Sequence, residues 1–454
     1  MKGDKMIKSD VLIIGGSATG LVAAMTAKQD HPEKNVTLIR KEEKVMIPCG
    51  IPYIYGTVAS SDNNILPDGG LNKLGVDIIV DEVISVDTTL KLCTTKLGKE
   101  IAYNKLIMGT GSMPIIPGWL KGTELENVFT IPKDKDYLDD FQQKLKGLQK
   151  VVVVGAGFIG VELSDELNKI DKEVTLVEIL PSILGATFDD EFSSKAQENL
   201  VSRGVTVKSN CGIKSINGSR HVESVTFNNG TTMEADAVIL ALGYAPNTKL
   251  ADSMGLTLNE FGFIKADQYR RTSIDDVFAA GDCAEKLDFA TGKISKIMLA
   301  STACIEARIA ALNLYELNTF SVFRGTLGIY STCIGDTAYG VAGLIEKVAV
   351  KEGFKIVTGS FTGVNRHPGK IGDAHEETVK LIVSARSGVI IGGEVLGGKC
   401  AGELINTIGI IIQNNMTVHD LIMTQIGTQP LLTASPAGFP LIKAAEIVAK
   451  TLRH

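Results

Sequence analysis

The stretch that decides the fold is KVVVVGAGFIGVELSDELNKIDKEVTLVEIL, residues 150–180. It opens with an apolar, β-branched run that is typical of a buried parallel strand. A complete G-x-G-x-x-G follows at Gly155, Gly157 and Gly160, and a helical pattern then leads to a second apolar strand. The first glycine permits a tight turn, the second lets backbone approach a pyrophosphate, and the third lets the helix pack on the strand. The stretch therefore predicts a β-α-β unit that binds a dinucleotide.

A second unit of the same pattern lies near the start of the chain. SDVLIIGGSATGLVAAMTAKQDHPEKNVTLIR, residues 9–40, also runs from an apolar strand through glycines into a helix and on to a strand. Gly15 and Gly20 keep the first and third positions of the fingerprint, but Ser17 occupies the middle one. We expect a second dinucleotide-binding unit here, with one irregular position.

The ribose ends of the two units differ. Glu178 ends the second strand of the 150–180 unit, 23 residues after its first glycine. A carboxylate there accepts hydrogen bonds from a ribose 2′-hydroxyl and repels a 2′-phosphate, which predicts a preference for NADH over NADPH. In the other unit Ile39 and Arg40 occupy this neighbourhood. Glu42 or Glu43 would then have to substitute for the missing acid.

Three further segments end in glycine turns. TSIDDVFAAGDCAE, residues 272–285, is an apolar strand that stops at Gly281 and Asp282, where a carboxylate can accept a bond from a ligand hydroxyl near a pyrophosphate. The other two are LIMGTGSMPIIPG and ILALGYAPNTKL, which place Thr110, Gly111 and Gly243 directly after apolar runs. Alone, each is an ordinary turn, but together with the two glycine fingerprints they form a specific set.

The pattern changes beyond about residue 325. The segment 377–397 is predicted to be two strands joined by a turn at Ser387 and Gly388. The segments 400–422 and 439–454 have the apolar spacing of amphipathic helices. This part of the chain is therefore predicted to be a separate α+β domain.

The bulk composition excludes several classes of protein. The chain has 454 residues, of which 44% are hydrophobic and 22% charged, and its formal net charge of −6 provides no basic field for nucleic acid. Seven scattered cysteines without a C-x-x-C argue against a disulfide framework and against a zinc site. No apolar run approaches the roughly 18 to 20 residues of a membrane helix. We expect about three domains, no metal, no membrane partner and a cytoplasmic setting.

One cysteine stands in an unusual position. IPCGIPYIYG, residues 47–56, places Cys49 between prolines and glycines. Pro52 is suited to a first helical turn, so the thiol is expected at a helix N-terminus, where the macrodipole favours thiolate. Gly50 would keep the backbone clear of a cofactor or substrate. The other six cysteines have no such context and are expected to be packing residues.

With these motifs together, the chain resembles the two-dinucleotide-fold flavoprotein disulfide reductases over essentially its whole length. The resemblance implies an α/β fold with two Rossmann-like domains, for FAD and NAD, and a C-terminal α+β dimerisation domain. It implies that Asp282 contacts FAD, that Glu162 lies near the nicotinamide, and that the protein is a homodimer. The implied domains are a first FAD part, an inserted NAD domain, a second FAD part and the dimerisation domain, at 1–118, 119–245, 246–324 and 325–454.

The single cysteine indicates the branch of the family. Dithiol members have two cysteines separated by four residues, whereas here Ile54 is the fifth residue after Cys49. CGIPY resembles the single-cysteine branch, which comprises CoA-disulfide reductases, CoA-persulfide or polysulfide reductases, and NADH oxidases or peroxidases. The resemblance implies that Cys49 cycles between thiolate and a mixed disulfide or a sulfenic acid. An NADH-dependent reductase of a small electron-transfer protein is a further alternative.

Two C-terminal segments are candidates for substrate binding. The loop 363–376 contains Arg366, His367 and Lys370, whose charges are suited to CoA phosphates. The segment 425–436 resembles the family segment that enters the partner subunit's active site, where dithiol reductases have a histidine base before the proline. Here Gln429 occupies that position, and an amide cannot act as a general base. The sequence therefore does not identify the proton donor.

Overall fold

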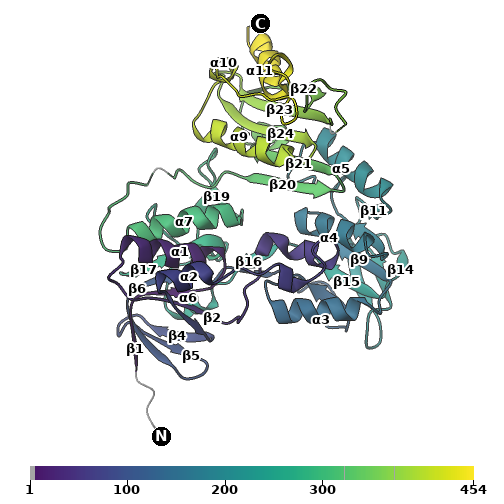
Figure 1. Ribbon diagram of the computed structural model, residues 1–454. Coiled ribbons are helices and arrows are strands. Elements are labelled where there is room, and N and C mark those ends of the chain that lie inside the picture. Colours follow the sequence, from purple (N-terminus) through teal and green to yellow (C-terminus); the bar gives the residue numbers. More distant parts are fainter. Residues whose placement is uncertain (1–5, 322, 373, 454) are drawn as a thin grey trace.

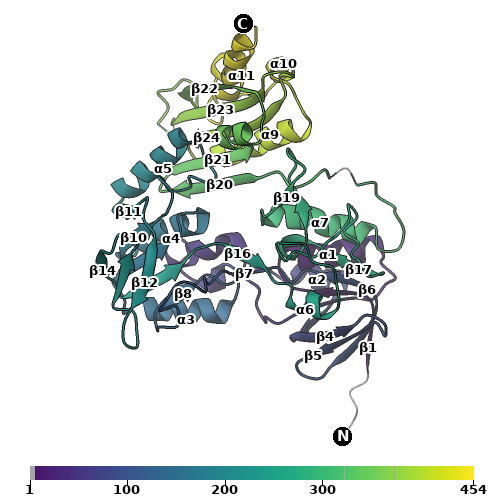
Figure 2. The same cartoon turned by 180° about the vertical axis from the view of Figure 1, so that it is seen from behind.

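The computed structural model describes residues 6–321, 323–372 and 374–453. Figures 1 and 2 show three parts: an N-terminal α/β part, a middle α/β part beside it, and a C-terminal α+β part above both. Both predicted β-α-β units are present, and the α/β fold with a C-terminal α+β domain is confirmed. The exact domain boundaries given above stay a prediction.

The N-terminal part is built on a seven-stranded sheet of order β3-β2-β1-β6-β5-β4, with β17 paired to β6. The strands are β1 (Ile7–Ile14), β2 (Val36–Arg40), β3 (Asp77–Val80), β4 (Val83–Asp87), β5 (Leu92–Thr95), β6 (Glu100–Met108) and β17 (Val277–Ala279). β3, β2, β1, β6 and β17 pair in parallel, whereas β5 pairs antiparallel with both β6 and β4. Helices α1 (Ala18–Asp30) and α7 (Ala300–Leu312) pack on each other over one face, where their alanines share a core with β1 and β2.

The middle part has a five-stranded parallel sheet of order β11-β10-β9-β15-β8. Its strands are β8 (Val128–Thr130), β9 (Lys150–Val154), β10 (Glu173–Val177), β11 (Thr206–Lys208) and β15 (Ala237–Leu240). Around it lie α3 (Lys135–Leu145), α4 (Phe158–Asn168), α5 (Asp190–Ser202) and the small sheet of β12 (Ile213–Asn217), β13 (Ser224–Phe227) and β14 (Thr232–Glu234). The apolar run that opens the stretch quoted first is β9, which lies between two parallel neighbours and is buried on both faces.

Short elements join these two parts. The antiparallel pair of β7 (Ser112–Pro114) and β16 (Tyr244–Pro246) lies between the two large sheets, and Figure 1 shows β16 there. The other short elements are α2 (Gly69–Leu74), α6 (Lys249–Ser253), β18 (Lys286–Leu287), β19 (Ile294–Ser295), and the 3-10 helices η1 (Pro48–Tyr55), η2 (Ser61–Asn63) and η3 (Gly281–Cys283).

The C-terminal part is a five-stranded antiparallel sheet of order β20-β21-β24-β23-β22. Its strands are β20 (Ile329–Ile334), β21 (Thr337–Gly343), β22 (Ile356–Val364), β23 (Glu376–Ser384) and β24 (Ile390–Gly397). Its helices are α8 (Glu346–Lys351), α9 (Ala401–Gln413), α10 (Val418–Ile422), η4 (Pro436–Gly438) and α11 (Pro440–Thr451). The hairpin of β23 and β24 confirms the turn predicted at Ser387 and Gly388.

The segment 400–422, expected as one amphipathic helix, is two. Helix α9 ends at Gln413, Asn415 has a φ of +51°, and α10 starts afresh from a capping box in which Thr417 and Asp420 bind each other's backbone N–H groups. The apolar spacing continues across this break and therefore conceals it. Among the described residues, no helix is both long and apolar enough to cross a membrane.

Candidate functional site

A large cavity lies where the carboxyl ends of parallel strands from the two large sheets meet. Its volume is about 2040 Å³, against roughly 300–1,000 Å³ for an ordinary ligand site. Residues of both glycine turns line it, and so do Cys49 and Glu162. We call it the central cavity. Its size and its two glycine turns are suited to two dinucleotides rather than one.

The first glycine turn follows β1. Gly15 has a φ of +114°, and a Cβ there would lie 2.1 Å from the carbonyl oxygen of Gly109. A Cβ on Gly20 would lie 1.7 Å from the carbonyl oxygen of Gly15, so this glycine lets α1 pack against the turn. Ser17 precedes α1 and makes no side-chain capping bond to it. The first N–H groups of α1 are thus left for an anion at the cavity wall.

The second glycine turn has the same construction after β9. Gly155 has a φ of +98°, and a Cβ on Gly160 would lie 1.9 Å from the carbonyl oxygen of Gly155. Gly157 precedes α4, and a Cβ there would meet nothing within 4 Å. Its missing side chain therefore leaves open space for a phosphate at the helix N-terminus, as the fingerprint predicts.

Beside each of the two glycine turns, a charged side chain lies at the position expected for the ribose of a bound dinucleotide. Glu178 follows β10 and accepts hydrogen bonds from the N–H of Ala156 at 2.7 Å and of Leu180 at 2.9 Å. These bonds hold its carboxylate beside the second glycine turn, on the cavity wall. A ribose at that turn would meet a fixed negative charge.

Arg40 lies at the equivalent position of the first turn and lines the cavity, but its guanidinium is engaged elsewhere. It forms a two-pronged ion pair with Asp68, both N–O distances being 2.6 Å, and donates to the carbonyl oxygen of Glu43 at 2.9 Å. Of Glu42 and Glu43, the two acids considered as substitutes for the missing ribose-binding acid, Glu42 lines the cavity. The ribose contact of the first unit stays a prediction for Arg40 and Glu42.

The predicted set of turn residues lies at the junction of the two sheets. Thr110, Gly111 and Gly243 line the cavity, and the hydroxyl of Thr110 donates to the carbonyl oxygen of Asn247 at 2.6 Å. Gly281 instead packs against α1, since a Cβ there would lie 2.1 Å from the hydroxyl of Thr19. Asp282, its neighbour, lines the cavity.

Lys133 is a cavity residue that the sequence did not reveal. It lies between β8 and α3, and its ammonium contacts Asp282 at 2.8 Å and the hydroxyl of Ser112 at 3.0 Å. Burial alone would raise the pKa of Asp282, but the charge of Lys133 and the hydrogen bonds from Lys133 and Ser112 lower it. No motif surrounds Lys133 in the chain. Its partner is 149 residues away, so only the folded structure brings them together.

Cys49 lies in the first turn of η1 and is exposed on the wall of the central cavity. The helix starts at Pro48, and Pro52 lies inside it rather than in its first turn. The predicted place of the thiol near a helix start therefore holds, with Pro48 in the role expected for Pro52. Asn64 fixes the entry to this helix, since its side chain donates to the carbonyl oxygen of Ile47 at 2.9 Å.

The expectation that the helix start favours thiolate is wrong in its net direction. Burial among neighbouring groups raises the pKa of the Cys49 thiol, and the carboxylate of Glu162 adds to the rise. Lys133 acts in the opposite direction but does not offset them. A short 3-10 helix has too small a dipole to outweigh them.

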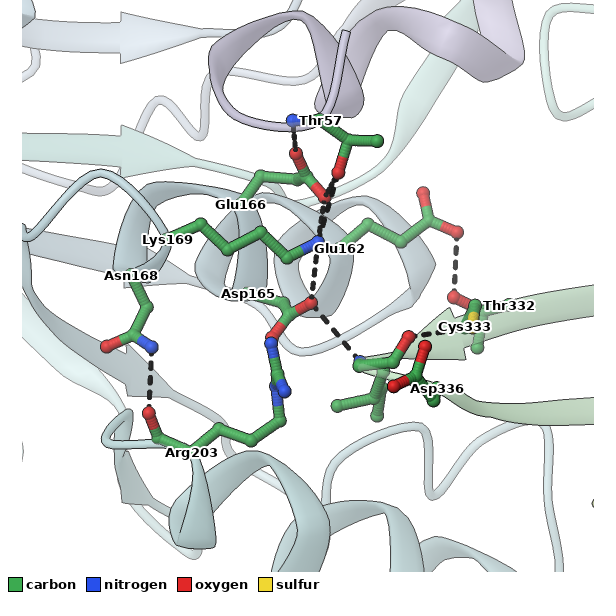
Figure 3. A network of polar contacts seen from close by, with 12 residues as sticks. Thr57, Glu162, Asp165, Glu166, Asn168, Lys169, Arg203, Thr332, Cys333 and Asp336 are labelled. Carbon is green, nitrogen blue, oxygen red and sulfur yellow. Dashed lines mark hydrogen bonds and ion pairs between the residues drawn. The ribbon is translucent and has the colours of Figure 1, made fainter. Parts of the chain in front are cut away.

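Glu162 connects α4 to two other elements. Its carboxylate accepts a hydrogen bond from Thr332 on β20 at 2.8 Å and another from the hydroxyl of Tyr53 on η1. Figure 3 shows Glu162 and Thr332 facing each other across the gap between α4 and β20. Burial raises the pKa of Glu162 to about 7, although both hydrogen bonds act to lower it. The group can therefore hold or release a proton at neutral pH, on the cavity wall beside Cys49.

The four predicted substrate residues do not lie in the cavity of their own chain. From the described C-terminal part, the residues that line it are Ile329, Tyr330 and Ser331. The structure does bring the two candidate segments together: Nδ1 of His367 lies 3.0 Å from the carbonyl oxygen of Thr433, and the His367 N–H donates to that of Pro430. Gln429, Arg366 and Lys370 belong to these same two segments.

Comparison with known proteins decides the family. Residues 9–307 match the model of the pyridine nucleotide-disulphide oxidoreductases, and residues 329–437 match the dimerisation domain of the same family. The chain belongs to this family. It is an oxidoreductase that uses FAD and a nicotinamide dinucleotide. The fit is physical as well, because both glycine turns exclude side chains where backbone must approach a pyrophosphate.

Individual relatives cover nearly the full length. The chain is 30% identical to the NAD(P)H coenzyme A polysulfide/persulfide reductase of Pyrococcus horikoshii, over 98% of this chain and 99% of the relative. It is 29% identical to the NADH oxidase of Methanocaldococcus jannaschii, over 98% and 99%. Among solved structures, an NAD-dependent persulfide reductase from A. fulgidus superposes with a TM-score of 0.90 at 28% identity, over 97% of this chain and 83% of that one.

Proposed function

We propose that the protein passes two electrons from NADH, through FAD and Cys49, to a small sulfur acceptor: a CoA disulfide, a CoA persulfide or a polysulfide. The observation that carries the proposal is the position of Cys49, an exposed thiol on the wall of a cavity that both glycine turns also line. The names of the relatives, a CoA polysulfide/persulfide reductase and a persulfide reductase, support this class of acceptor.

The chain's residues divide the binding task. Gly15, Ser17 and Gly20 would hold the FAD pyrophosphate at the N-terminus of α1. Asp282, on the cavity wall, would contact the ribityl chain of FAD. Gly155 and Gly157 would hold the NADH pyrophosphate at α4, with Glu178 at its ribose. Bound FAD would accept a hydride from the nicotinamide and supply the two electrons that reduce a disulfide.

The proposed reaction at Cys49 consumes the sulfur acceptor, two electrons and two protons. Cys49 as thiolate attacks one sulfur of the acceptor, a new S–S bond forms to Cys49, and the second sulfur leaves as a thiolate. Two electrons then cleave the new bond and return Cys49 to thiolate, and two protons complete two thiols. Because its pKa is about 7, Glu162 can hold a proton near this step. Gln429 cannot supply one, since its amide does not ionise.

We further propose that the working unit is a homodimer. The segment 425–436 exposes Leu431 and Leu432 to 61% and 66%, and Met423 just before it to 86%. Exposed apolar side chains at one place favour a covered surface. A second copy that covers it would also bring Arg366, His367, Lys370 and Gln429 to a cavity, where the positive charges of Arg366 and Lys370 are suited to CoA phosphates.

A second function has its own support. The similarity to an NADH oxidase at 29% identity favours oxygen or peroxide as acceptor, with Cys49 passing through a sulfenic acid. One experiment separates the two. Steady-state NADH oxidation is measured side by side with CoA disulfide, polysulfide, peroxide and O₂. The proposal predicts the highest kcat/KM for a sulfur acceptor, and a preference for O₂ or peroxide by an order of magnitude would replace it by the oxidase.

A further inference from the structure

We propose that Glu166 is a positioning residue that fixes the Cys49 helix, η1, on the nucleotide-binding helix α4. The inference rests on the proposed function, in which Cys49 is the redox thiol. It assigns to Glu166 no contact with substrate or cofactor. Its effect is to determine where Cys49 lies relative to the second glycine turn.

The helix that carries Cys49 needs support from outside. It is a 3-10 helix of eight residues with Pro52 inside it, whereas 3-10 runs beyond three or four residues are uncommon. Pro52 has no N–H to donate within the helix. The hydrogen bonds of η1 itself are therefore too few to hold its conformation, and its contacts with neighbouring elements must do so.

Glu166 provides one such contact, through Thr57 two residues beyond the end of η1. Its side chain is 1% exposed, and its two oxygens accept from both donors of Thr57: the hydroxyl at 2.8 Å and the backbone N–H at 2.5 Å. Lys169 neutralises the carboxylate at 2.5 Å. The fit is close, because a Cβ on Gly56 would lie 2.6 Å from the Glu166 carboxylate. Figure 3 shows Glu166 turned toward Thr57, with Lys169 beside it.

Glu166 lies on α4, the helix that follows the second glycine turn. Gly157 precedes α4, Glu162 in its first turns binds Tyr53 of η1, and Glu166 one turn later binds Thr57, two residues beyond the end of η1. Residues four apart share a helix face, so two carboxylates on one face of α4 bind Tyr53 in the second half of η1 and Thr57 just beyond its end. The position of Cys49 is thereby tied to the helix that begins at the second glycine turn.

The neighbouring carboxylate provides a matched control. Asp165 is 2% exposed and also pairs with Lys169, at 3.2 Å. It faces elsewhere, however, because its oxygens bind Arg203 at 2.6 Å and the N–H of Gly335 at 3.4 Å. Figure 3 shows this separate direction. Loss of either charge removes an ion pair with Lys169 on the same turn of α4, but of the two only Glu166 binds Thr57, just beyond the end of η1.

The experiment compares Glu166→Gln with Asp165→Asn in the intact FAD enzyme. An amide at 166 keeps the size but has one acceptor oxygen for two Thr57 donors and no charge for Lys169. The first readout is the rate at which iodoacetamide alkylates Cys49, followed by peptide mass spectrometry. The second is stopped-flow flavin absorbance, for reduction by NADH and for reoxidation by the best acceptor.

We expect iodoacetamide to alkylate Cys49 at least about threefold faster in Glu166→Gln than in wild type, because η1 is released. Reduction by NADH should stay within about twofold, and reoxidation should slow by about tenfold. Asp165→Asn should leave the alkylation rate within about 1.5-fold of wild type. Equal changes in both variants, or no change in either, would overturn the proposal.

A third variant covers the case in which Glu166→Gln does not fold. Thr57→Val removes the hydroxyl donor but keeps the backbone N–H bond to Glu166. It should increase Cys49 alkylation in the same direction by a smaller factor, and an unchanged rate would overturn the proposal. The alkylation comparison does not depend on turnover. Failure of the proposed function appears separately, as a Cys49→Ser variant with wild-type acceptor turnover.

Discussion

Lys133 and Asp282 form an ion pair 2.8 Å long that joins the middle α/β part of the chain to the N-terminal part. Both residues lie on the wall of the central cavity. The charge of Lys133 lowers the pKa of the Asp282 carboxyl and also lowers that of the Cys49 thiol. One cation therefore favours the ionised form of both groups at the place where we propose that electrons pass, although the pKa of Cys49 is raised overall.

Replacement of this cation should make Cys49 less reactive. In Lys133→Met the positive charge that favours thiolate is lost, while Glu162 and Asp282 still raise the thiol pKa. Alkylation of Cys49 by iodoacetamide near pH 7 should slow several-fold, and the midpoint of its pH profile should move upward. Lys135→Met is the control, because Lys135 pairs with Asp139 at 2.6 Å outside the cavity. An unchanged profile in Lys133→Met would rule out this electrostatic link.

Glu178→Ala should change the choice of dinucleotide. Since Glu178 holds a fixed carboxylate at the second glycine turn, a 2′-phosphate would meet like charge there. We expect NADH to be preferred over NADPH by at least about an order of magnitude in kcat/KM, and the variant to narrow this ratio. Glu173→Ala, at the other end of β10, should leave the ratio as it is. Equal kcat/KM values for the two cofactors in the wild type would contradict the assignment of Glu178.

Glu162→Gln should change how stability depends on pH. The pKa of Glu162 is about 7 in the fold, above its ordinary value of 4.5. A carboxyl whose pKa is raised by folding contributes stability that is fully present below about pH 4.5 and lost as pH rises through about 7. Glutamine does not ionise, so the Tm of the variant should increase relative to that of the wild type as pH rises from about 5 to 8. The exposed Glu198→Gln should show no such trend, and a pH-independent difference for Glu162→Gln would refute the assignment.

The oligomeric state is tested at the exposed leucines. If a second copy covers the segment 425–436, Leu432→Glu should place a charge in the interface and yield monomers with little acceptor turnover. Lys450→Glu, an exposed change on α11, should remain dimeric. Sedimentation at micromolar concentration decides this. A wild-type monomer with full activity would contradict both the dimer and the proposed role of Gln429.

The sequence revealed those parts of the site that depend on local backbone chemistry. The glycines at 15, 20, 155 and 160 are required because a Cβ would meet a carbonyl oxygen within about 3 Å, and such requirements leave a fixed spacing in the chain. The hairpin of β23 and β24 was predicted for a similar reason, since its turn residues are adjacent.

Ion pairs between residues that are far apart in the sequence left no such recognisable spacing. The partner of Arg40 is Asp68, 28 residues away, and that of Lys133 is Asp282, 149 residues away. The ionisation of Cys49 was predicted in the wrong direction for the same reason. The helix start is visible in the sequence, whereas burial, the main cause of the raised thiol pKa, and the added effect of Glu162 arise only when the chain folds.

The central claim is that Cys49 carries electrons from the flavin to a sulfur acceptor, and stopped-flow kinetics of Cys49→Ser tests it most directly. Serine is protonated at neutral pH and cannot form the mixed disulfide. Flavin reduction by NADH should therefore survive within a few-fold, while turnover of the sulfur acceptor falls by several orders of magnitude. Cys333→Ser, which alters a half-buried thiol on β20, should retain both. Wild-type acceptor turnover in Cys49→Ser would contradict the account and favour direct reduction of an electron-transfer protein.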